Sequence, residues 1–126
     1  MILSINHIQL VAEKDLAIKL RDFYCGVVGL QEGFRPNFER FGFWLYIGEK
    51  DAVHLITPKE GDSRSLQKSS YDHVAFKASD YAGVLKKLKL LDFPFEEKLI
   101  PGMIAHQIFL KDPAGNRVEL NFEELK

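Results

Sequence analysis

The sequence contains a single cysteine, Cys25, among its 126 residues. One thiol cannot form an internal disulfide bond, and at the apolar end of an expected helix it is a small buried hydrophobe rather than a nucleophile. The sequence also has little net charge. It contains 17 Lys and Arg and 18 Asp and Glu residues, which gives a formal net charge of −1. This balance argues against a partner that needs a strong positive field, such as nucleic acid or an anionic membrane.

Long apolar runs are absent as well. No stretch approaches the roughly 20 apolar residues that a membrane-spanning helix needs. The N-terminus has no basic segment followed by an apolar one, so it does not have the pattern of a signal peptide. We therefore expect a cytoplasmic protein of one domain, large enough to bury roughly two-thirds of its unfolded surface without a disulfide or metal staple.

What the sequence does contain is a repeat. The phrases "NHIQLVAEKD" and "DHVAFKASD" resemble each other, and each has a histidine in second position. In the first half we expect a strand at residues 5–11 and a helix over "KDLAIKLRDFYCGVV", with Asp15 as its N-cap and Gly26 or Gly29 at its end. Three strands follow at "QEGFRP", "RFGFWLYIG" and "DAVHLIT".

The second half repeats this order after a polar connector at residues 58–70. "YDHVAFKA" predicts a strand and "SDYAGVLKKLKLLD" a helix capped by Ser79 or Asp80. Strands follow at "PFEEKLI", "AHQIFLK" and "NRVELNF", with "DPAG" as a tight turn between the last two. We therefore predict one α+β domain over residues 1–126, made of two βαβββ modules in tandem (1–57 and 71–126) that form a curved mixed sheet.

Aligning the two halves places His7 opposite His73 and His54 opposite Glu119, at offsets of 66 and 65 residues. Side chains alternate across a strand, and each of these four lies on the face opposite the apolar side chains. A buried carboxylate is costly unless it is paired or binds a cation, and neutral imidazole is the commonest metal ligand. One such histidine alone is usually an ordinary surface or core residue. The joint pattern predicts a site for zinc, nickel, cobalt, manganese or ferrous iron.

The final hairpin adds a fifth polar candidate. If the "DPAG" turn pairs Lys111 with Asn116, His106 lies opposite Asn121, and directly paired residues share a face. His106 then faces the same space as Glu119. Four roles are open for His106 there: a proton shuttle, a hydrogen-bond partner of a metal ligand, a substrate contact, or a hydrogen-bonded residue of the wall.

Aromatic and polar side chains are expected to complete the walls of this space. By the repeat, Phe41 and Phe43 line the wall beside His54. The candidate substrate contacts on this face are Gln9, Phe41, Phe43 and Asn121. Lys77 and Arg117 point the same way, where they could meet an anionic substrate or extend to water, and we favour the latter.

The chain resembles the vicinal oxygen chelate superfamily, which includes glyoxalases, bleomycin resistance proteins and extradiol dioxygenases. The phrases that carry the resemblance are "INHIQLVA", "FYCGVVGL", "YDHVAFKA" and "FLKDPAGNRVELNF", and together they cover essentially the whole chain. The resemblance implies a glyoxalase-like pair of βαβββ modules, a divalent metal ion and commonly a homodimer. The metal positions of the family match His7, His54, His73 and Glu119.

The resemblance also implies a reaction class, in which two neighbouring oxygens of a small substrate chelate the metal. We expect a lyase or isomerase, with Glu119 as ligand, base or both and His106 as a second acid–base group. His54 stands where glyoxalase I relatives have glutamate, and "HIQLV" lacks the arginine with which they grip glutathione. The alternatives are a ferrous extradiol-type dioxygenase, although Phe109 replaces the tyrosine usual in those enzymes, or a protein that binds a small molecule or drug without catalysis.

Overall fold

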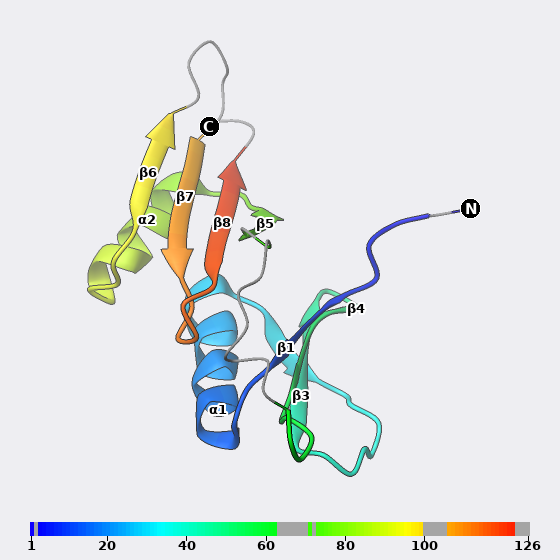
Figure 1. Cartoon of the computed structure of the whole chain (residues 1–126). Coiled ribbons are helices and arrows are strands. Elements are labelled where there is room, and N and C mark those ends of the chain that lie inside the picture. Colours follow the sequence, from blue (N-terminus) through cyan, green and yellow to red (C-terminus); the bar gives the residue numbers. More distant parts are fainter. Residues whose placement is uncertain (2, 63–70, 72, 100–105, 123–126) are drawn as a thin grey trace. The chain divides into compact units, whose positions relative to one another are not determined.

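The computed structural model of the protein describes residues 1, 3–62, 71, 73–99 and 106–122 (Figure 1). The chain divides into two units, residues 1–68 and 69–126, and each is described by itself. Each unit runs strand, helix and then three strands, and its strands form one four-stranded mixed sheet. The predicted α+β class with two βαβββ modules in tandem is confirmed.

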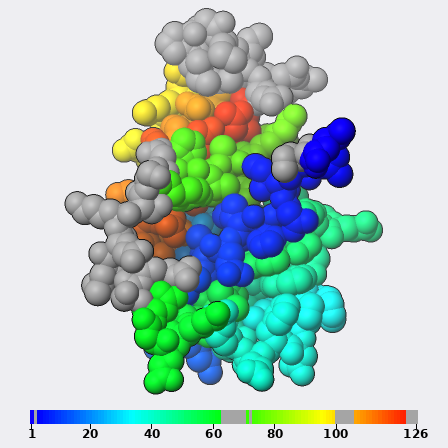
Figure 2. Space-filling model, turned by 45° about the vertical axis from the view of Figure 1, so that its right-hand side comes forward, coloured from blue at the N-terminus to red at the C-terminus, as the bar shows by residue number. Residues whose placement is uncertain are grey.

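The sheet of the first unit has the strand order β1–β4–β3–β2, with β1 parallel to β4 and the other neighbours antiparallel. Its elements are β1 (Ile8–Val11), α1 (Lys14–Phe23), the π-helical turn η1 (Tyr24–Val28), β2 (Gln31–Gly33), β3 (Gly42–Ile47) and β4 (Lys50–Ile56). The predicted first strand is too long at its start, since residues 3–7 are exposed and precede β1. This N-terminal stretch, blue in Figure 2, stands out at the surface.

The core of the first unit lies between α1 and the sheet. Ala17 and Leu20 share one helix face and are completely buried, as expected for residues three apart. They pack toward β3 and β4, whose side chains Leu45, Val53 and Leu55 are also buried. Burying each large aliphatic side chain of this kind contributes about 1.5–3 kcal/mol to folding, so the helix fixes which face of the sheet is apolar.

The ends of α1 differ in how well the sequence predicts them. The N-cap is Glu13, without a side-chain hydrogen bond, so the predicted cap Asp15 is wrong. Asp15 lies instead in the first turn, where a negative charge favourably meets the positive end of the helix dipole. The predicted end at Gly29 is confirmed. Gly29 has a φ of 105°, a left-handed conformation, and its N–H closes the π-turn onto the carbonyl of Tyr24 at 2.9 Å.

The sheet of the second unit has the order β5–β8–β7–β6, again with one parallel pair, β5 and β8. Its elements are β5 (His73–Lys77), α2 (Tyr81–Leu90), β6 (Glu96–Leu99), β7 (His106–Lys111) and β8 (Arg117–Phe122). Asp80 is confirmed as the helix cap, and its carboxylate accepts the N–H of Gly83 at 3.2 Å. The apolar face of β7 and β8 buries Ile108, Val118 and Leu120.

The register of the last hairpin differs from the prediction by one residue. Lys111 pairs with Arg117 rather than with Asn116. Asn116 belongs to the turn, because the carboxylate of Asp112 accepts its backbone N–H at 2.8 Å and its side-chain amide at 2.9 Å. The same carboxylate accepts the N–H of Ala114 at 2.9 Å. These bonds draw one more residue into the loop than the "DPAG" pattern suggests.

A shift of one residue moves a side chain to the other face of the sheet. His106 therefore pairs with Phe122, and its ring stacks on Tyr81 of α2 with 4.2 Å between ring centroids. Phe109 takes the position opposite Glu119. The prediction that His106 faces Glu119 is wrong. The acid–base role predicted for His106 therefore loses its geometric basis.

The same correction applies to the aromatic wall of the first unit. Phe43 pairs with Leu55 and is buried on the helix side of the sheet, while Trp44 pairs with His54. Phe41 meets Phe43 edge to face, with 5.0 Å between ring centroids. The prediction that Phe41 and Phe43 line a wall beside His54 is wrong, because the β3–β4 register places Trp44 opposite His54 and turns Phe43 to the other face.

None of the helices in the described part of the chain combines the length and the hydropathy that a membrane crossing requires.

Candidate functional site

In the second unit two candidate ligands meet on the polar face of the sheet. His73 is the first residue of β5, and Glu119 lies in the adjacent parallel strand β8. The Nε2 atom of His73 is 3.3 Å from Oε1 of Glu119. Two ligands that each lie about 2.1 Å from a tetrahedral cation are about 3.4 Å apart. The pair forms an imidazole–carboxylate contact whose separation also suits two donors on one metal ion.

The carboxylate of Glu119 is buried and oriented. Its side chain is only 7% exposed, whereas that of His73 is 32% exposed. Asn121, two residues further along the strand, donates its side-chain amide to Oε2 of Glu119 at 2.9 Å. This bond leaves Oε1 directed toward His73. Asn121, predicted as a substrate contact, is thus placed beside the carboxylate and holds one of its oxygens.

An aromatic ring carrying two nearby cations lies next to this pair. The ring of Phe109 meets His73 edge to face, with 6.2 Å between centroids. The guanidinium of Arg117 lies 4.0 Å and the ammonium of Lys98 lies 5.3 Å from the centroid of Phe109. Such cation–π contacts stabilise a desolvated positive charge over the ring.

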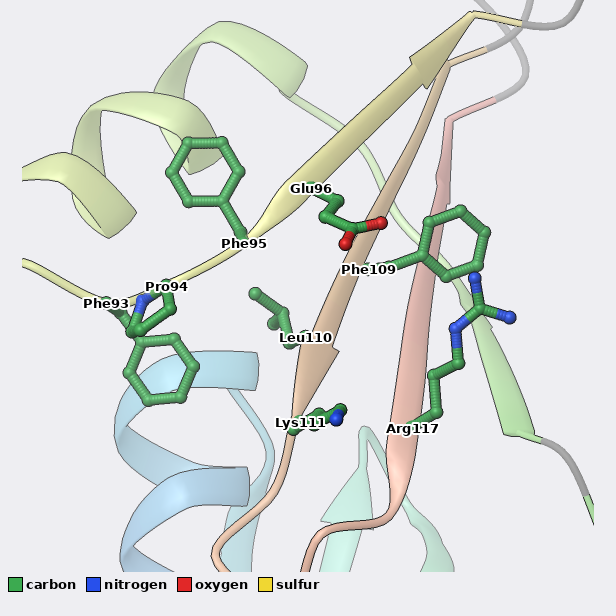
Figure 3. Close-up of a pocket in the computed structure, with 8 residues that line it drawn as sticks. All are labelled: Phe93, Pro94, Phe95, Glu96, Phe109, Leu110, Lys111 and Arg117. Atoms are coloured by element: carbon green, nitrogen blue, oxygen red, sulfur yellow. The ribbon is translucent and has the colours of Figure 1, made fainter.

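Phe109 also borders a cavity of about 510 Å³ (Figure 3). In the close-up the carboxylate of Glu96 points toward the ring of Phe109 from one side, and the guanidinium of Arg117 lies against it. The lining residues are Phe93, Pro94, Phe95, Glu96, Phe109, Leu110, Lys111 and Arg117. A mostly apolar cavity with a few charged groups is typical of a small-molecule site.

In the first unit the two candidate histidines form part of a stack of rings. His54 lies between His7 and Trp44, with centroid distances of 3.9 Å and 4.1 Å and nearly parallel planes. His54 is buried, and its Nε2 is 2.7 Å from Oδ2 of Asp51. This hydrogen bond lowers the pKa of the Asp51 carboxyl. Nδ1 of His7 bonds to Oδ1 of Asn6 at 2.8 Å.

The stack limits how these two histidines can bind a metal. The lone pair of an imidazole nitrogen lies in the ring plane, and the planes of His7 and His54 are inclined by only 14°. Their lone pairs therefore do not converge on one cation in this arrangement. Since Nε2 of His54 is bonded to Asp51, only Nδ1 of His54 is left to coordinate a metal ion. Within the described ranges no three His, Cys, Asp or Glu side chains gather as a metal site.

Sequence reasoning missed Trp44 and Asp51. Asp51 lies three residues before His54 and would face the other way in a regular strand. A register shift between Leu45 and Tyr46 pairs Asp51 with Tyr46 and brings it to the face of His54. The sequence holds no clear signal for this irregularity. Gln9, a predicted substrate contact, pairs with His54 in the β1–β4 ladder and shares its face.

Comparisons with known proteins agree with this architecture. Residues 4–120 match the family model described as the Glyoxalase/Bleomycin resistance protein/Dioxygenase superfamily. A lactoylglutathione lyase of Pseudomonas putida is 25% identical over 91% of this chain and 82% of its own length.

Two solved structures show the same fold. A glyoxalase family protein from Bacillus anthracis has a TM-score of 0.75, 21% identity and 98% coverage of both chains. A variant of the fosfomycin resistance protein FosX from Listeria monocytogenes, in complex with Mn(II) and 1S,2S-dihydroxypropylphosphonic acid, has a TM-score of 0.72 and 20% identity, covering 99% of this chain and 95% of its own. The family match spans most of the sequence, and the chain therefore belongs to the Glyoxalase/Bleomycin resistance protein/Dioxygenase superfamily.

Proposed function

We propose that the protein is a divalent-metal-dependent lyase or isomerase of the glyoxalase type, acting on a small substrate with two neighbouring oxygens. The observation that carries the proposal is the His73–Glu119 pair, with its 3.3 Å donor separation and buried carboxylate. Family membership supports it, as do a lactoylglutathione lyase among the relatives and the Mn(II)-bound FosX among the structures of the same fold.

The roles of the residues follow from their chemistry. A bound divalent cation supplies Lewis-acid polarisation of a substrate oxygen. His73 and Glu119 would hold the cation, and Asn121 keeps Oε2 of the carboxylate in place. Oε1 of Glu119, the oxygen that Asn121 does not hold, would serve by turns as metal donor and as proton acceptor. Phe109 excludes water from one side of the pair and lines the cavity for the apolar part of the substrate.

Several features stay predictions. His7 and His54 remain predicted ligands, although the stack favours His7 as the donor and His54 as the residue that positions it. The identity of the metal, homodimer formation and a cytoplasmic location also stay predictions. A ferrous dioxygenase is the weaker alternative because Phe109, which meets His73, carries no hydroxyl group. A binding protein without catalysis is the other alternative.

Elemental analysis of protein purified without chelator tests the proposal. We expect about one divalent metal per chain, and loss of most of it in His73→Ala and Glu119→Ala. His106→Ala is the matched control, because its imidazole stacks on Tyr81 on the opposite face and should leave the metal content unchanged. Metal-free wild-type protein, or full metal content in both site variants, would refute the assignment.

Turnover of hemithioacetals activated by nickel or zinc favours the lyase, and oxygen consumption with catechols favours the dioxygenase.

A further inference from the structure

Two arginines lie together in the first unit, in the loop between β2 and β3 (cyan in Figure 1). The Nη2 atom of Arg35 donates to the carbonyl of Arg40 at 3.0 Å, and Nη1 of Arg40 donates to the carbonyl of Thr57 at 3.0 Å. Burial, and then the charge of Arg40, lower the pKa of Arg35. The loop thus brings two like charges close together, an arrangement that an anion would stabilise.

The position of Arg35 depends on Gly42. A Cβ atom at residue 42 would lie 3.0 Å from Nη2 and 3.2 Å from Cζ of Arg35, so the guanidinium occupies the space that a side chain would fill. Gly42 and Trp44 are two residues apart in β3 and share a face. The guanidinium therefore lies on the face of the sheet that carries Trp44 and His54.

Arg35 has a donor without an acceptor. Its Nε atom is buried and has no hydrogen-bond partner. Both side chains donate to backbone carbonyls. Among the residues that the structure describes, neither Arg35 nor Arg40 forms an ion pair. A guanidinium offers five N–H donors, and leaving a buried one unpaired is unfavourable. The positive charge that these two side chains carry would be offset by an oxyanion.

A cavity and two aromatic rings adjoin this pair. The cavity measures about 430 Å³ and is lined by Phe38, Glu39, Arg40, Ile56 and Lys59. The guanidinium of Arg35 lies 4.9 Å from the ring centroid of Phe38, and that ring is 6.1 Å from Trp44. Glu39 is the one carboxylate among these lining residues, so the cationic side chains outnumber it.

We infer that this pocket binds a small organic anion, whose carboxylate or phosphoryl group meets Arg40, beside which Arg35 lies, and whose apolar part rests on Phe38. Guanidinium groups suit both oxyanions because their paired N–H donors match two oxygens. The binding site stands on the contacts of the first unit alone. The further statement that the anion is the substrate's own acidic group rests on the proposed function.

Trp44 provides the assay, because it is the sole tryptophan of the sequence and contacts Phe38. Full-length protein freed of metal by a chelator is titrated with phenylphosphonate, phenylacetate and the neutral benzyl alcohol while tryptophan fluorescence is recorded. We expect saturable binding of at least one anion and none of the alcohol. Binding of phenylphosphonate alone would indicate a site for phosphoryl groups. Binding of both anions would indicate a general oxyanion site. Raising the salt from about 0.1 M to about 1 M should weaken the binding.

Variants locate the site. Arg40→Gln should weaken anion binding about tenfold, the effect of one lost charge-assisted hydrogen bond. Lys14→Gln is the matched control, since it removes another cation of the same unit, one that lies over Phe41. Circular dichroism checks that each variant folds, and Arg35→Lys, which keeps the charge but not the fork of donors, should bind with intermediate affinity.

The outcomes separate this inference from the proposed function. Arg40→Gln should keep its metal while losing anion affinity, and Glu119→Ala should lose metal while keeping anion affinity. The inference is overturned if neither anion changes the fluorescence up to about 10 mM, if benzyl alcohol binds equally well, or if Arg40→Gln binds like the wild type.

Discussion

Replacing Asn121 with alanine tests how far the proposed metal site depends on the orientation of Glu119. The amide of Asn121 donates to Oε2 of Glu119 at 2.9 Å, while Oε1 faces His73. Hydrogen bonds to charged groups contribute about 1.5–3 kcal/mol. Asn121 is only half-buried, so the lower value applies. About 1.5 kcal/mol corresponds to roughly a tenfold loss of metal affinity, within the 10–100-fold range found for residues that hold a metal ligand.

The assay is competition between the protein and a chromophoric chelator for zinc or manganese. Gln107→Ala is the matched control, because Gln107 pairs directly with Asn121 across the β7–β8 ladder and shares its face. We expect the dissociation constant to rise about tenfold in Asn121→Ala and to stay within about twofold of the wild type in the control. Equal affinities in Asn121→Ala and the wild type would show that Oε2 needs no partner when metal is bound, and the assigned role of Asn121 would be wrong.

Two further predictions concern parts of the fold outside the donor pair. Tyr81 donates its hydroxyl to Glu97, and burial together with this bond raises the pKa of Tyr81 to about 12. The folded state thus holds the Tyr81 proton more tightly than the unfolded chain, so stability should fall as the pH rises from about 10 to about 12. The latest-titrating part of the tyrosinate absorbance should be missing in Tyr81→Phe. Gly42→Ala should lower the free energy of unfolding by about 1–3 kcal/mol, because the new Cβ would collide with the carbonyl of Leu55. Gly26→Ala, whose Cβ would meet nothing within 4 Å, is the control in the same thermal melts, and an equal loss in both variants would contradict the steric argument.

The sequence predicted well what depends on periodicity. Strands and helices follow from alternating and helical spacing of apolar residues, and the repeated phrases predicted two modules of one topology. Glu119 and His73 were placed on one face because both occupy the polar positions of adjacent parallel strands. The cap at Asp80 and the end at Gly29 follow from local backbone chemistry that a few residues suffice to specify.

What the sequence did not predict depends on single-residue shifts. The loop of the last hairpin takes up Asn116 because the carboxylate of Asp112 binds it, and turn patterns alone do not count that residue. A register shift in the β3–β4 ladder, at Ala52 of β4, brings Asp51 to His54 in the same way. Each shift changes little in the backbone but exchanges the faces of the side chains beyond it. For this reason the fold was predictable while the roles of Phe43 and His106 were not.

The strand registers of the two units support the duplication and also show how the two copies differ. Trp44 lies opposite His54 as Phe109 lies opposite Glu119, so the repeat holds in the pairing of the strands. In the second unit, the strand neighbour of Glu119 is Ala75, whose small side chain leaves space beside the carboxylate.

In the first unit, the equivalent space is filled. His54 is enclosed by His7 and Trp44, and its Nε2 is bonded to Asp51. The carboxylate of Glu119, with Oε1 beside His73, and an imidazole held on both faces are suited to different tasks. Binding a cation requires an accessible lone pair, whereas stacking fixes the orientation of a neighbouring ring. The two copies thus share a strand pairing, and they differ in which side chain stands at the equivalent position, His54 in the first unit and Glu119 in the second.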